Sequence, residues 1–282
     1  MSIHLITDSC CELPDELKQR IRPDVAPLKV TVIGGGEYLD DGTVSIPELL
    51  ADMAASRKGA VSACPSVDDF AVHMERHDQC FVVTLSSKLS GSYNAARVAA
   101  ELVLESHPHK KIHVFDSESA SAGEALLVHF LHEKIEQGLT FEQIIPLANQ
   151  KIATMKTMFV LEDLGNLLKS GRLKKLPGMI ASALSLCPIM SDNGHGEIKL
   201  LDKARGIQNA LRRLIDIIRE HTAKENKQSI TMMMTFCNCL ERAEAFRVQI
   251  LAVCPAIKNI LMVPTGALSA MYANDGGIIV AF

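Results

Sequence analysis

The sequence predicts an α/β protein of two domains, in which a mostly parallel, doubly wound sheet is followed by a mixed-sheet α/β domain. The length of 282 residues exceeds the common domain size of about 100–200 residues. Apolar runs alternate with segments of helical period in the first half, and a hairpin motif interrupts this alternation in the second half. We place the boundary after residue 155, which gives domains of residues 1–155 and 156–282.

Four apolar runs in the first half have the length and composition of strands: Ile3 to Thr7, Val25 to Ile33, Phe81 to Leu85 and Lys111 to Phe115. Helix candidates begin between or after them, at Ser45, at Ser66, at Ser90 and at about Ala120. This alternation is typical of βαβ units, in which successive strands run parallel.

Local signals mark several helix starts. Ser45 with Glu48, and Thr140 with Gln143, fit the capping box, in which two side chains satisfy backbone N–H groups that are free at a helix start. Ser66 is followed by two Asp residues, whose charges suit the positive end of the helix dipole. We therefore expect helices to begin at these three positions.

The second half has a different order of elements. A strand from Thr157 to Leu161, a short Leu-rich helix to Lys169 and an apolar stretch from Leu176 to Cys187 precede Asn193-Gly-His-Gly196, the strongest hairpin signal in the sequence. Helices are expected at residues 205–221 and 240–253, and strands at residues 230–236 and 257–263. The last five residues, 278–282, form an apolar run that predicts a buried strand.

Composition excludes several classes of protein. The 29 basic and 33 acidic residues give a net charge of −4 without a long basic run, so no nucleic-acid partner is expected. No basic segment precedes an apolar stretch at the start, and no segment approaches about 18 apolar residues in a row. The eight cysteines include no Cys-x-x-Cys pair, which favours reduced thiols and a cytoplasmic location.

Hydroxyl groups and glycines gather where predicted strands give way to helices. The segments are Thr7-Asp8-Ser9, Ser62-Ala-Cys-Pro-Ser66 and Leu89-Ser-Gly-Ser-Tyr93. Ligands of open parallel sheets bind beyond the carboxyl ends of the strands, where helix N-termini offer free N–H groups to an anion. The three segments therefore predict one shared site, whereas each serine taken alone is more simply a helix cap.

Catalytic and metal motifs are weak. Ser90 lacks the Gly-x-Ser-x-Gly frame of a nucleophile elbow, and Gly34-Gly-Gly36 lacks the Lys-Ser/Thr of a phosphate loop. His73 with His77, and His129 with His132, are spaced for one helix face, but neither pair carries the His-Glu-x-x-His pattern. We predict no cofactor and no metal.

Two arginines next to glycines are candidates for contact with an anion. Arg172 lies in Lys169-Ser-Gly-Arg172, and Arg205 lies in Lys203-Ala-Arg-Gly206. The planar guanidinium fork binds anions well where the backbone turns tightly. A charge that offsets the helix dipole is an equally good interpretation of either residue.

Taken in order, these segments resemble the DegV family of bacterial fatty-acid-binding proteins. Its successive motifs are matched by Thr7-Asp8-Ser9 with Leu13-Pro14, Pro27-Leu28, Ser62 to Ser66, Leu89 to Ala95, Asp116-Ser117, Leu161 to Leu164 with Lys169 to Arg172, Cys187-Pro-Ile with Gly194 to Glu197, and Lys203 to Gly206. The ordered set is specific although no single motif is, and it spans residues 3 to about 210.

The resemblance implies a non-enzymatic carrier that holds one long-chain fatty acid in an apolar tunnel between two domains. A separate fatty acid kinase would phosphorylate the bound carboxylate. By the same carry-over, Ser62 and Ser90 supply head-group hydroxyls, with Gly91 and Ser92 as nearby backbone donors. Arg172 and Arg205 would serve the phosphorylated head group or the kinase surface.

One residue departs from the family pattern. The family usually carries a His in a segment resembling Gly-x-His-x-Gly-Pro-Gly, and that His contacts the carboxylate. Tyr272 stands at this place in the present sequence, and the Pro is absent. A phenol donates a hydrogen bond but carries no positive charge near neutral pH, because its pKa is about 10. Binding is therefore expected with altered or lost kinase coupling.

Two other functions remain open at this point. A serine-dependent acyl hydrolase or transferase would use Ser90 and would need a base within hydrogen-bond reach. A scaffold for the kinase that has lost lipid binding would follow from the change at Tyr272. We also expect transient membrane contact during loading, although the sequence has no strongly basic amphipathic helix.

Overall fold

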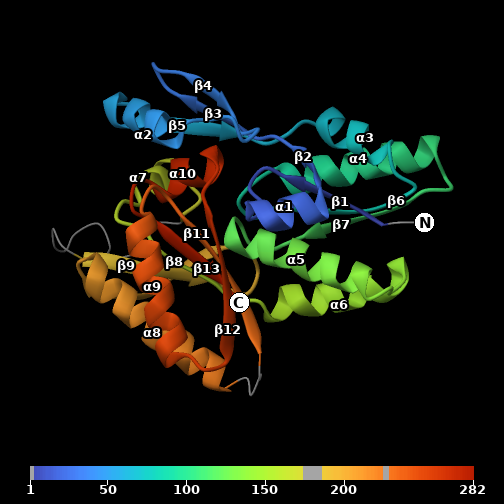
Figure 1. The fold of residues 1–282 in the computed structure, drawn as a ribbon. Coiled ribbons are helices and arrows are strands. Elements are labelled where there is room, and N and C mark those ends of the chain that lie inside the picture. Colours follow the sequence, from blue (N-terminus) through green and yellow to red (C-terminus); the bar gives the residue numbers. More distant parts are fainter. Residues whose placement is uncertain (1–2, 174–185, 225–228) are drawn as a thin grey trace.

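The computed structural model describes residues 3–173, 186–224 and 229–282, which form three sheets with helices around them (Figure 1). Sheet A contains β1 (His4–Asp8), β2 (Asp24–Ala26), β6 (Gln79–Thr84) and β7 (Lys111–Asp116). Its strand order is β2-β1-β6-β7, and all neighbours are parallel. The parallel sheet predicted for the first half is confirmed.

Helices cover both faces of sheet A (Figure 1). One face packs against α3 (Val67–Met74) and α4 (Ser92–Ser106), and the other against α1 (Asp15–Ile21), α5 (Ala122–Glu136) and α6 (Phe141–Thr154). Along β1, Leu5 joins the cluster of α5 and α6, and Ile6 joins that of α3 and α4. Burial on both faces explains why these strands are continuous apolar runs.

Sheet B is a three-stranded antiparallel sheet that the sequence did not predict. It contains β3 (Lys29–Val32), β4 (Glu37–Leu39) and β5 (Ala60–Ala63), in the order β4-β3-β5, and α2 (Ile46–Ala55) connects β4 with β5. The single strand expected at Val25 to Ile33 is divided between β2 and β3, because Pro27 has no N–H for a continuous ladder.

Sheet C forms the core of the second half. It contains β8 (Thr157–Val160), β9 (Leu186–Asp192), β10 (Ile198–Arg205), β11 (Ile230–Phe236), β12 (Ile257–Pro264) and β13 (Ile278–Ala281). The order is β10-β9-β8-β13-β11-β12, antiparallel except between β11 and β12. The predicted hairpin and mixed sheet are confirmed, and the C-terminal apolar run is a buried central strand.

The helices of the second half are α7 (Gly165–Lys169), α8 (Ile207–Lys224), α9 (Leu240–Val253) and α10 (Ala267–Ala273). The sequence did not predict α10. Most of the apolar stretch expected from Leu176 to Cys187 lies outside the described residues, and its end enters β9.

Two of the expected helix starts form capping boxes and one does not. At Ser66 and Thr140, the side chain accepts a hydrogen bond from the third helical N–H, and the N-cap backbone is bonded in return. The capping box predicted at Ser45 is wrong, because its side chain makes no cap hydrogen bond. Its ψ angle is 107°, against 169° at Ser66 and 163° at Thr140, which leaves the hydroxyl poorly aligned with that N–H.

The two halves share two hydrophobic clusters, because Met233 and Ala281 of sheet C join the cluster of α5 and α6 as well. Leu28, Val30 and Leu49 from the first half pack with Leu161 and Met271 from the second, and sheet B lies over α7 and α10 (Figure 1). Helix α6 ends at Thr154 and sheet C begins at Thr157, on either side of the boundary expected after residue 155. The division into two domains at that point stays a prediction.

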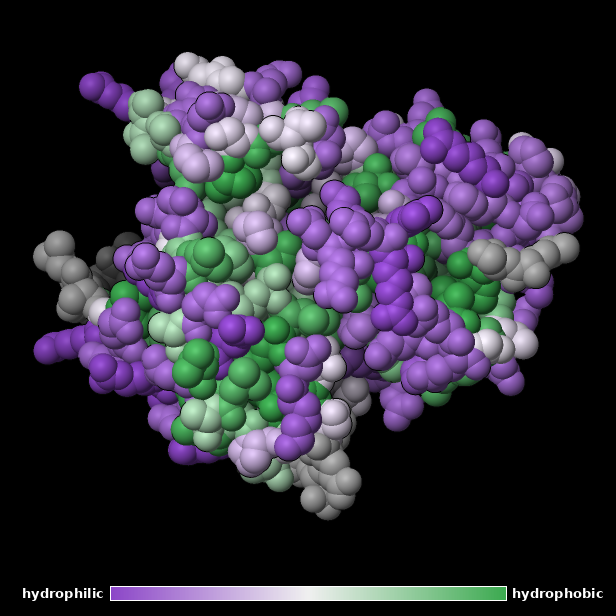
Figure 2. All heavy atoms as spheres, in the orientation of Figure 1, coloured by the Kyte–Doolittle hydropathy of each residue, from purple (hydrophilic) through white to green (hydrophobic). Residues whose placement is uncertain are grey.

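The surface differs between the two halves. Figure 2 shows apolar side chains over the face that carries α9, whereas the face of α5 and α6 is largely hydrophilic. Four exposed apolar side chains belong to α9, namely Leu240, Val248, Leu251 and Val253. In the part of the chain that the structure describes, no helix combines the length and apolar character needed to cross a membrane. All eight cysteines are free thiols.

Candidate functional site

A cavity of about 350 Å³ lies between the carboxyl ends of sheet A and the second half of the chain. The segments that follow all four strands of sheet A line it, through Cys10, Leu28, Leu85 and Ala120. The opposite wall comes from sheet C, α7 and α10, and includes Phe159, Leu161, Leu167, Leu268 and Ile279. The volume falls within the range of about 300–1,000 Å³ that is typical of small-molecule sites.

Two hydroxyl groups from distant parts of the chain meet in this cavity. Ser62 lies in β5, and Tyr272 lies in α10. The oxygen atoms Ser62 Oγ and Tyr272 Oη are 3.1 Å apart, and either group can donate the hydrogen bond. A ligand carboxylate placed here would accept hydrogen bonds from both hydroxyls. The residue at the place of the family's His therefore faces the cavity.

Ser90 and Gly91 also line the cavity, at the start of α4. Ser90 Oγ lies 3.0 Å from Ser92 Oγ and accepts a hydrogen bond from the Ser92 backbone N–H at 3.2 Å. A Cβ atom at Gly91 would lie 3.0 Å from Cys64 Sγ, so glycine allows the segments after β5 and before α4 to approach closely. The two serine segments thus converge on one site.

Ser92 does not line the cavity, since its side chain is fully buried and contributes a hydrogen bond to Asp8. Asp8 lies at the end of β1 and accepts backbone hydrogen bonds from Cys10 at 3.0 Å and Leu85 at 3.0 Å. Ser92 thereby helps to fix the loops under the cavity. Of the first predicted segment, Thr7, Asp8 and Ser9 stay outside the lining.

The two candidate arginines lie in different places. Arg172 lines the cavity, where its Nε donates to the carbonyl oxygen of Leu89 at 3.1 Å and its Nη1 donates to that of Ser170 at 3.0 Å. It therefore fixes the segment that carries Ser90. Arg205 is exposed at the end of β10 and does not line the cavity. The structure does not bring the two guanidinium groups to one anion.

Two buried carboxyl groups of the first half hold the start of α10. Glu12 Oε1 accepts the backbone N–H of Gly266 at 3.0 Å. Asp40 accepts those of Ala267 at 2.7 Å and Leu268 at 3.2 Å. These bonds satisfy N–H groups that a helix start leaves free. They also position Tyr272, which lies at the other end of the same short helix.

These carboxyl groups were not predicted from the sequence, because neither lies in a recognisable capping pattern with α10. Burial raises the pKa of Glu12 to about 8 and also raises the pKa of Asp40. Glu12 therefore holds a proton over much of the pH range in which an exposed Glu would be charged.

A second buried acidic pair lies below the cavity. One ligand atom from each of Asp8, Cys10 and Glu124 lies within 4.8 Å of the others. Burial raises the pKa of Asp8 to about 7, and burial together with the charges of Asp8 and Glu12 raises the pKa of Glu124 well above its ordinary value. Two carboxyl groups this close do not both ionise near neutral pH, so the pair retains a proton.

The surroundings of Ser90 do not resemble those of a catalytic serine. Its side-chain oxygen bonds to Ser92, which is not a base. Among the described residues that line the cavity there is no His. Nucleophilic catalysis by serine requires a base within hydrogen-bond reach, and the hydrolase alternative gains no support from this geometry.

Known proteins are similar to this chain in both sequence and fold. Residues 2–282 match the family described as "Uncharacterised protein, DegV family". A DegV domain-containing protein of Streptococcus pneumoniae is 31% identical over 283 residues, which cover 100% of this chain and 99% of the relative.

Two crystal structures of similar proteins contain fatty acids. A DegV family protein from Ruminococcus gnavus, refined with vaccenic acid, has a TM-score of 0.92 and 36% identity and covers 100% of both chains. The Fatty Acid Kinase (Fak) B3 protein of Streptococcus pneumoniae, loaded with linoleic acid, has a TM-score of 0.88 and 31% identity and covers 100% of this chain and 99% of that one. The family match along nearly the whole chain, together with this shared fold, shows that the protein belongs to the DegV family.

Proposed function

We propose that this protein binds one long-chain fatty acid in the cavity between its two halves and performs no chemistry on it. The observation that carries the proposal is the cavity itself, because its apolar wall from both halves adjoins the hydroxyls of Ser62, Ser90 and Tyr272. The fatty acids in the structures of two relatives at 31% and 36% identity support this assignment.

The apolar wall and the hydroxyl groups contribute differently to the free energy of binding. About 10 buried methylene groups contribute up to about 8 kcal/mol, at about 0.8 kcal/mol each. A neutral hydrogen bond contributes only about 1 kcal/mol, but a buried carboxylate without partners would be costly. The apolar wall thus sets affinity, and Ser62 and Ser90 orient the head group.

The name of the similar Fak B3 protein supports a kinase partner for this chain too. In this proposal, a fatty acid kinase phosphorylates the carboxylate at the mouth of the cavity. The exposed Arg205 contributes to the kinase-facing surface, and Arg172 holds the Ser90 segment in place. The free thiols of all eight cysteines support a cytoplasmic carrier, which exchanges its acid during transient contact with a membrane.

Tyr272 gives the head-group site a different charge from that of relatives with His. Its hydroxyl donates a hydrogen bond without adding a positive charge near neutral pH. In this proposal, Tyr272 supports binding of the acid and makes phosphoryl transfer by the kinase slower than with His. Rates of acyl-phosphate formation by a fatty acid kinase, compared between wild type and Tyr272→His, test this; equal rates would contradict it.

Mass spectrometry of lipid extracted from the purified protein tests binding directly. We expect one fatty acid per chain, and uptake of added oleate by protein from which lipid has been removed. Absence of a co-purified acid together with absence of uptake would contradict the proposal. A protein that binds the kinase while its cavity stays free of lipid would instead fit a scaffold.

A further inference from the structure

Residues of types that can bind metal ions lie at the start of three adjacent strands of sheet A. His4 is the first residue of β1, Asp24 is the first residue of β2, and His77 lies two residues before the start of β6. Because the strand order is β2-β1-β6 and all three strands are parallel, their amino ends lie side by side. This edge of the sheet is opposite to the edge that forms the cavity.

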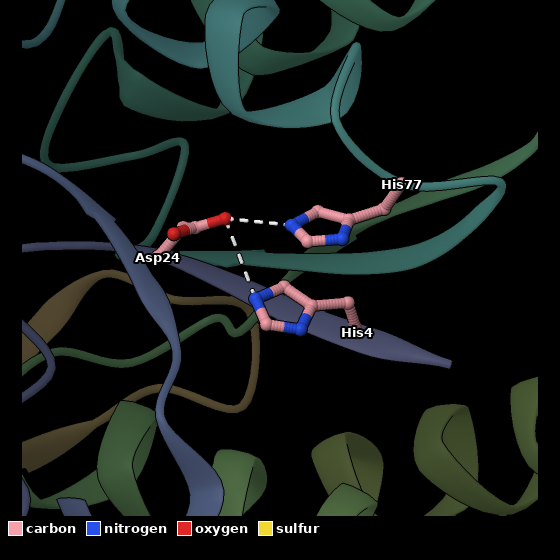
Figure 3. Close-up of side chains that lie close together, drawn as sticks. All are labelled: His4, Asp24 and His77. Atoms are coloured by element: carbon pink, nitrogen blue, oxygen red, sulfur yellow. Dashed lines mark hydrogen bonds and ion pairs between the residues drawn. The ribbon is translucent and has the colours of Figure 1, made fainter. Parts of the chain in front are cut away.

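The three side chains point toward one another (Figure 3). His77 Nε2 lies 2.8 Å and His4 Nε2 lies 3.3 Å from the same oxygen, Asp24 Oδ2. His73 Nδ1, from the last turn of α3, lies 3.8 Å from that oxygen. One ligand atom each from His4, Asp24 and His77 lies within 4.8 Å of the others.

These separations match those of a small tetrahedral metal site. With bonds of about 2.0–2.1 Å, the ligand atoms around Zn²⁺ are about 3.3 Å apart. The distances of 2.8 Å and 3.3 Å to Asp24 Oδ2 lie at or slightly below this value. Rotation of the side chains would make room for an ion where the hydrogen bond between His77 and Asp24 now lies.

Further contacts define the shape of the site. His4 Nε2 is a buried atom that lies 3.3 Å from Asp24 Oδ2, a longer contact than the 2.8 Å between His77 Nε2 and the same oxygen. The rings of His4 and His77 stack with centroids 3.7 Å apart and planes only 19° apart, so one ring must turn before both Nε2 lone pairs can point at the same ion. Arg76 Nη1 lies 3.5 Å from His73 Nδ1, and its charge makes His73 a weaker ligand than the other two.

We propose that His4, Asp24 and His77 bind one divalent transition-metal ion of the zinc class at the amino edge of sheet A. Water completes the coordination, since the three side chains are about a quarter exposed. Two imidazoles and one carboxylate form a donor set that suits Zn²⁺ and Co²⁺. The ion ties together β1, β2 and the segment before β6, and this role is independent of the proposed binding of fatty acid.

No metal was expected here from the sequence, because His73 and His77 do not form the His-Glu-x-x-His pattern of a metal site. Asp24 is 53 residues from His77 along the chain. Only the strand order brings the carboxylate to the two imidazoles.

Titration of tag-free protein with Zn²⁺, in competition with a chromophoric chelator, tests the proposal. We expect one ion per chain and at least a tenfold loss of affinity in His4→Ala, Asp24→Asn and His77→Ala. His73→Ala should have a smaller effect. His109→Ala is the matched control: His109 is 67% exposed and lies 3.8 Å from Asp78, outside the cluster, so its loss should leave the affinity unchanged.

The spectrum of bound Co²⁺ gives a second measurement on the wild-type protein. We expect visible absorption bands of a four-coordinate Co²⁺ ion with nitrogen and oxygen ligands. Added Zn²⁺ should displace the Co²⁺ and remove these bands. Equal Zn²⁺ affinity in the wild type and the His4→Ala/His77→Ala double variant would overturn the proposal, as would binding of several weak ions per chain.

A third measurement avoids variants that fail to fold. Diethyl pyrocarbonate modifies accessible neutral imidazoles, and its sites are mapped by mass spectrometry of the intact wild-type protein. We expect Zn²⁺ to protect His4 and His77 while His109 remains reactive. Unchanged modification of His4 and His77 at saturating Zn²⁺ would overturn the proposal.

Discussion

The two edges of sheet A differ in whether the second half of the chain covers them. This difference decides which kind of ligand the polar side chains at each edge can bind. The same three strands begin at His4, Asp24 and the segment of His77, and they lead at their carboxyl ends into the cavity wall. The amino edge is open, and the side chains of His4, Asp24 and His77 are 24–26% exposed. The carboxyl edge is covered by the second half, and Asp8, Glu12 and Asp40 are buried there. An open edge leaves room for a hydrated ion, whereas a covered edge encloses a chain of methylene groups.

The largest expected effect comes from filling the cavity. Ala120 is partly exposed and lines the apolar wall. In Ala120→Phe, the ring would displace about four methylene groups of a long-chain acid, a loss of about 3 kcal/mol or roughly a hundredfold in affinity. Isothermal titration calorimetry with oleate measures this loss of affinity.

Decanoate is the control ligand for Ala120→Phe, because a shorter chain should lose less affinity. Zn²⁺ binding at the opposite edge should stay as in the wild type. Equal losses for both acids would show that Ala120 is not beside the acyl chain, and a loss of Zn²⁺ affinity would show that the two edges are coupled.

The next effect concerns the contact between the halves. Asp40→Ala removes the acceptor of the Ala267 and Leu268 N–H groups, so the free energy of unfolding should fall by roughly 2–3 kcal/mol. Urea unfolding measures the change. The side chain of the neighbouring Asp41 is exposed and accepts hydrogen bonds from the backbone N–H and the hydroxyl of Thr43. Asp41→Ala should therefore cost less than about 1 kcal/mol, and equal costs would contradict a special role for Asp40.

Glu12 makes the covered edge sensitive to pH. Its pKa is about 8 in the folded protein, against 4.5 as its ordinary value. Between these values the folded chain holds a proton that the unfolded chain has lost. Stability therefore falls as pH rises through this window, by on the order of 2 kcal/mol between pH 6 and pH 8.

Glu12→Gln mimics the protonated acid and should remove this part of the pH dependence. Urea unfolding at several pH values measures the difference from the wild type, and the exposed Glu105→Gln is the control. The same pH dependence in Glu12→Gln and the wild type would show that Glu12 is already ionised in the folded protein.

The smallest effects concern the head-group hydroxyls. Ser62→Ala and Ser90→Ala should each weaken fatty acid binding by about 1–2 kcal/mol, since each removes a hydrogen bond to a buried carboxylate. Ser87→Ala is a matched control in the same loop, because Ser87 is exposed and outside the lining. Wild-type affinity for oleate in both cavity variants would remove Ser62 and Ser90 from the head-group site.

Local patterns in the sequence were enough to predict most of the elements. Strand and helix periods located β1, β6, β7, β11 and β12, and the glycines of Asn193 to Gly196 predicted the hairpin of β9 and β10. The same patterns placed Ser62 and Ser90 near the carboxyl edge of a parallel sheet. These features depend on residues that are close along the chain, so they can be predicted without knowing which elements pack together.

Only the tertiary structure decided which of these residues meet. Ser62 and Tyr272 are 210 residues apart, and Asp40 and Ala267 are 227 residues apart. Sheet B packs on the second half although it belongs to the first, and His4, Asp24 and His77 meet through strand order alone. Side-chain period encodes which face of an element is buried, but it does not encode the element against which that face packs.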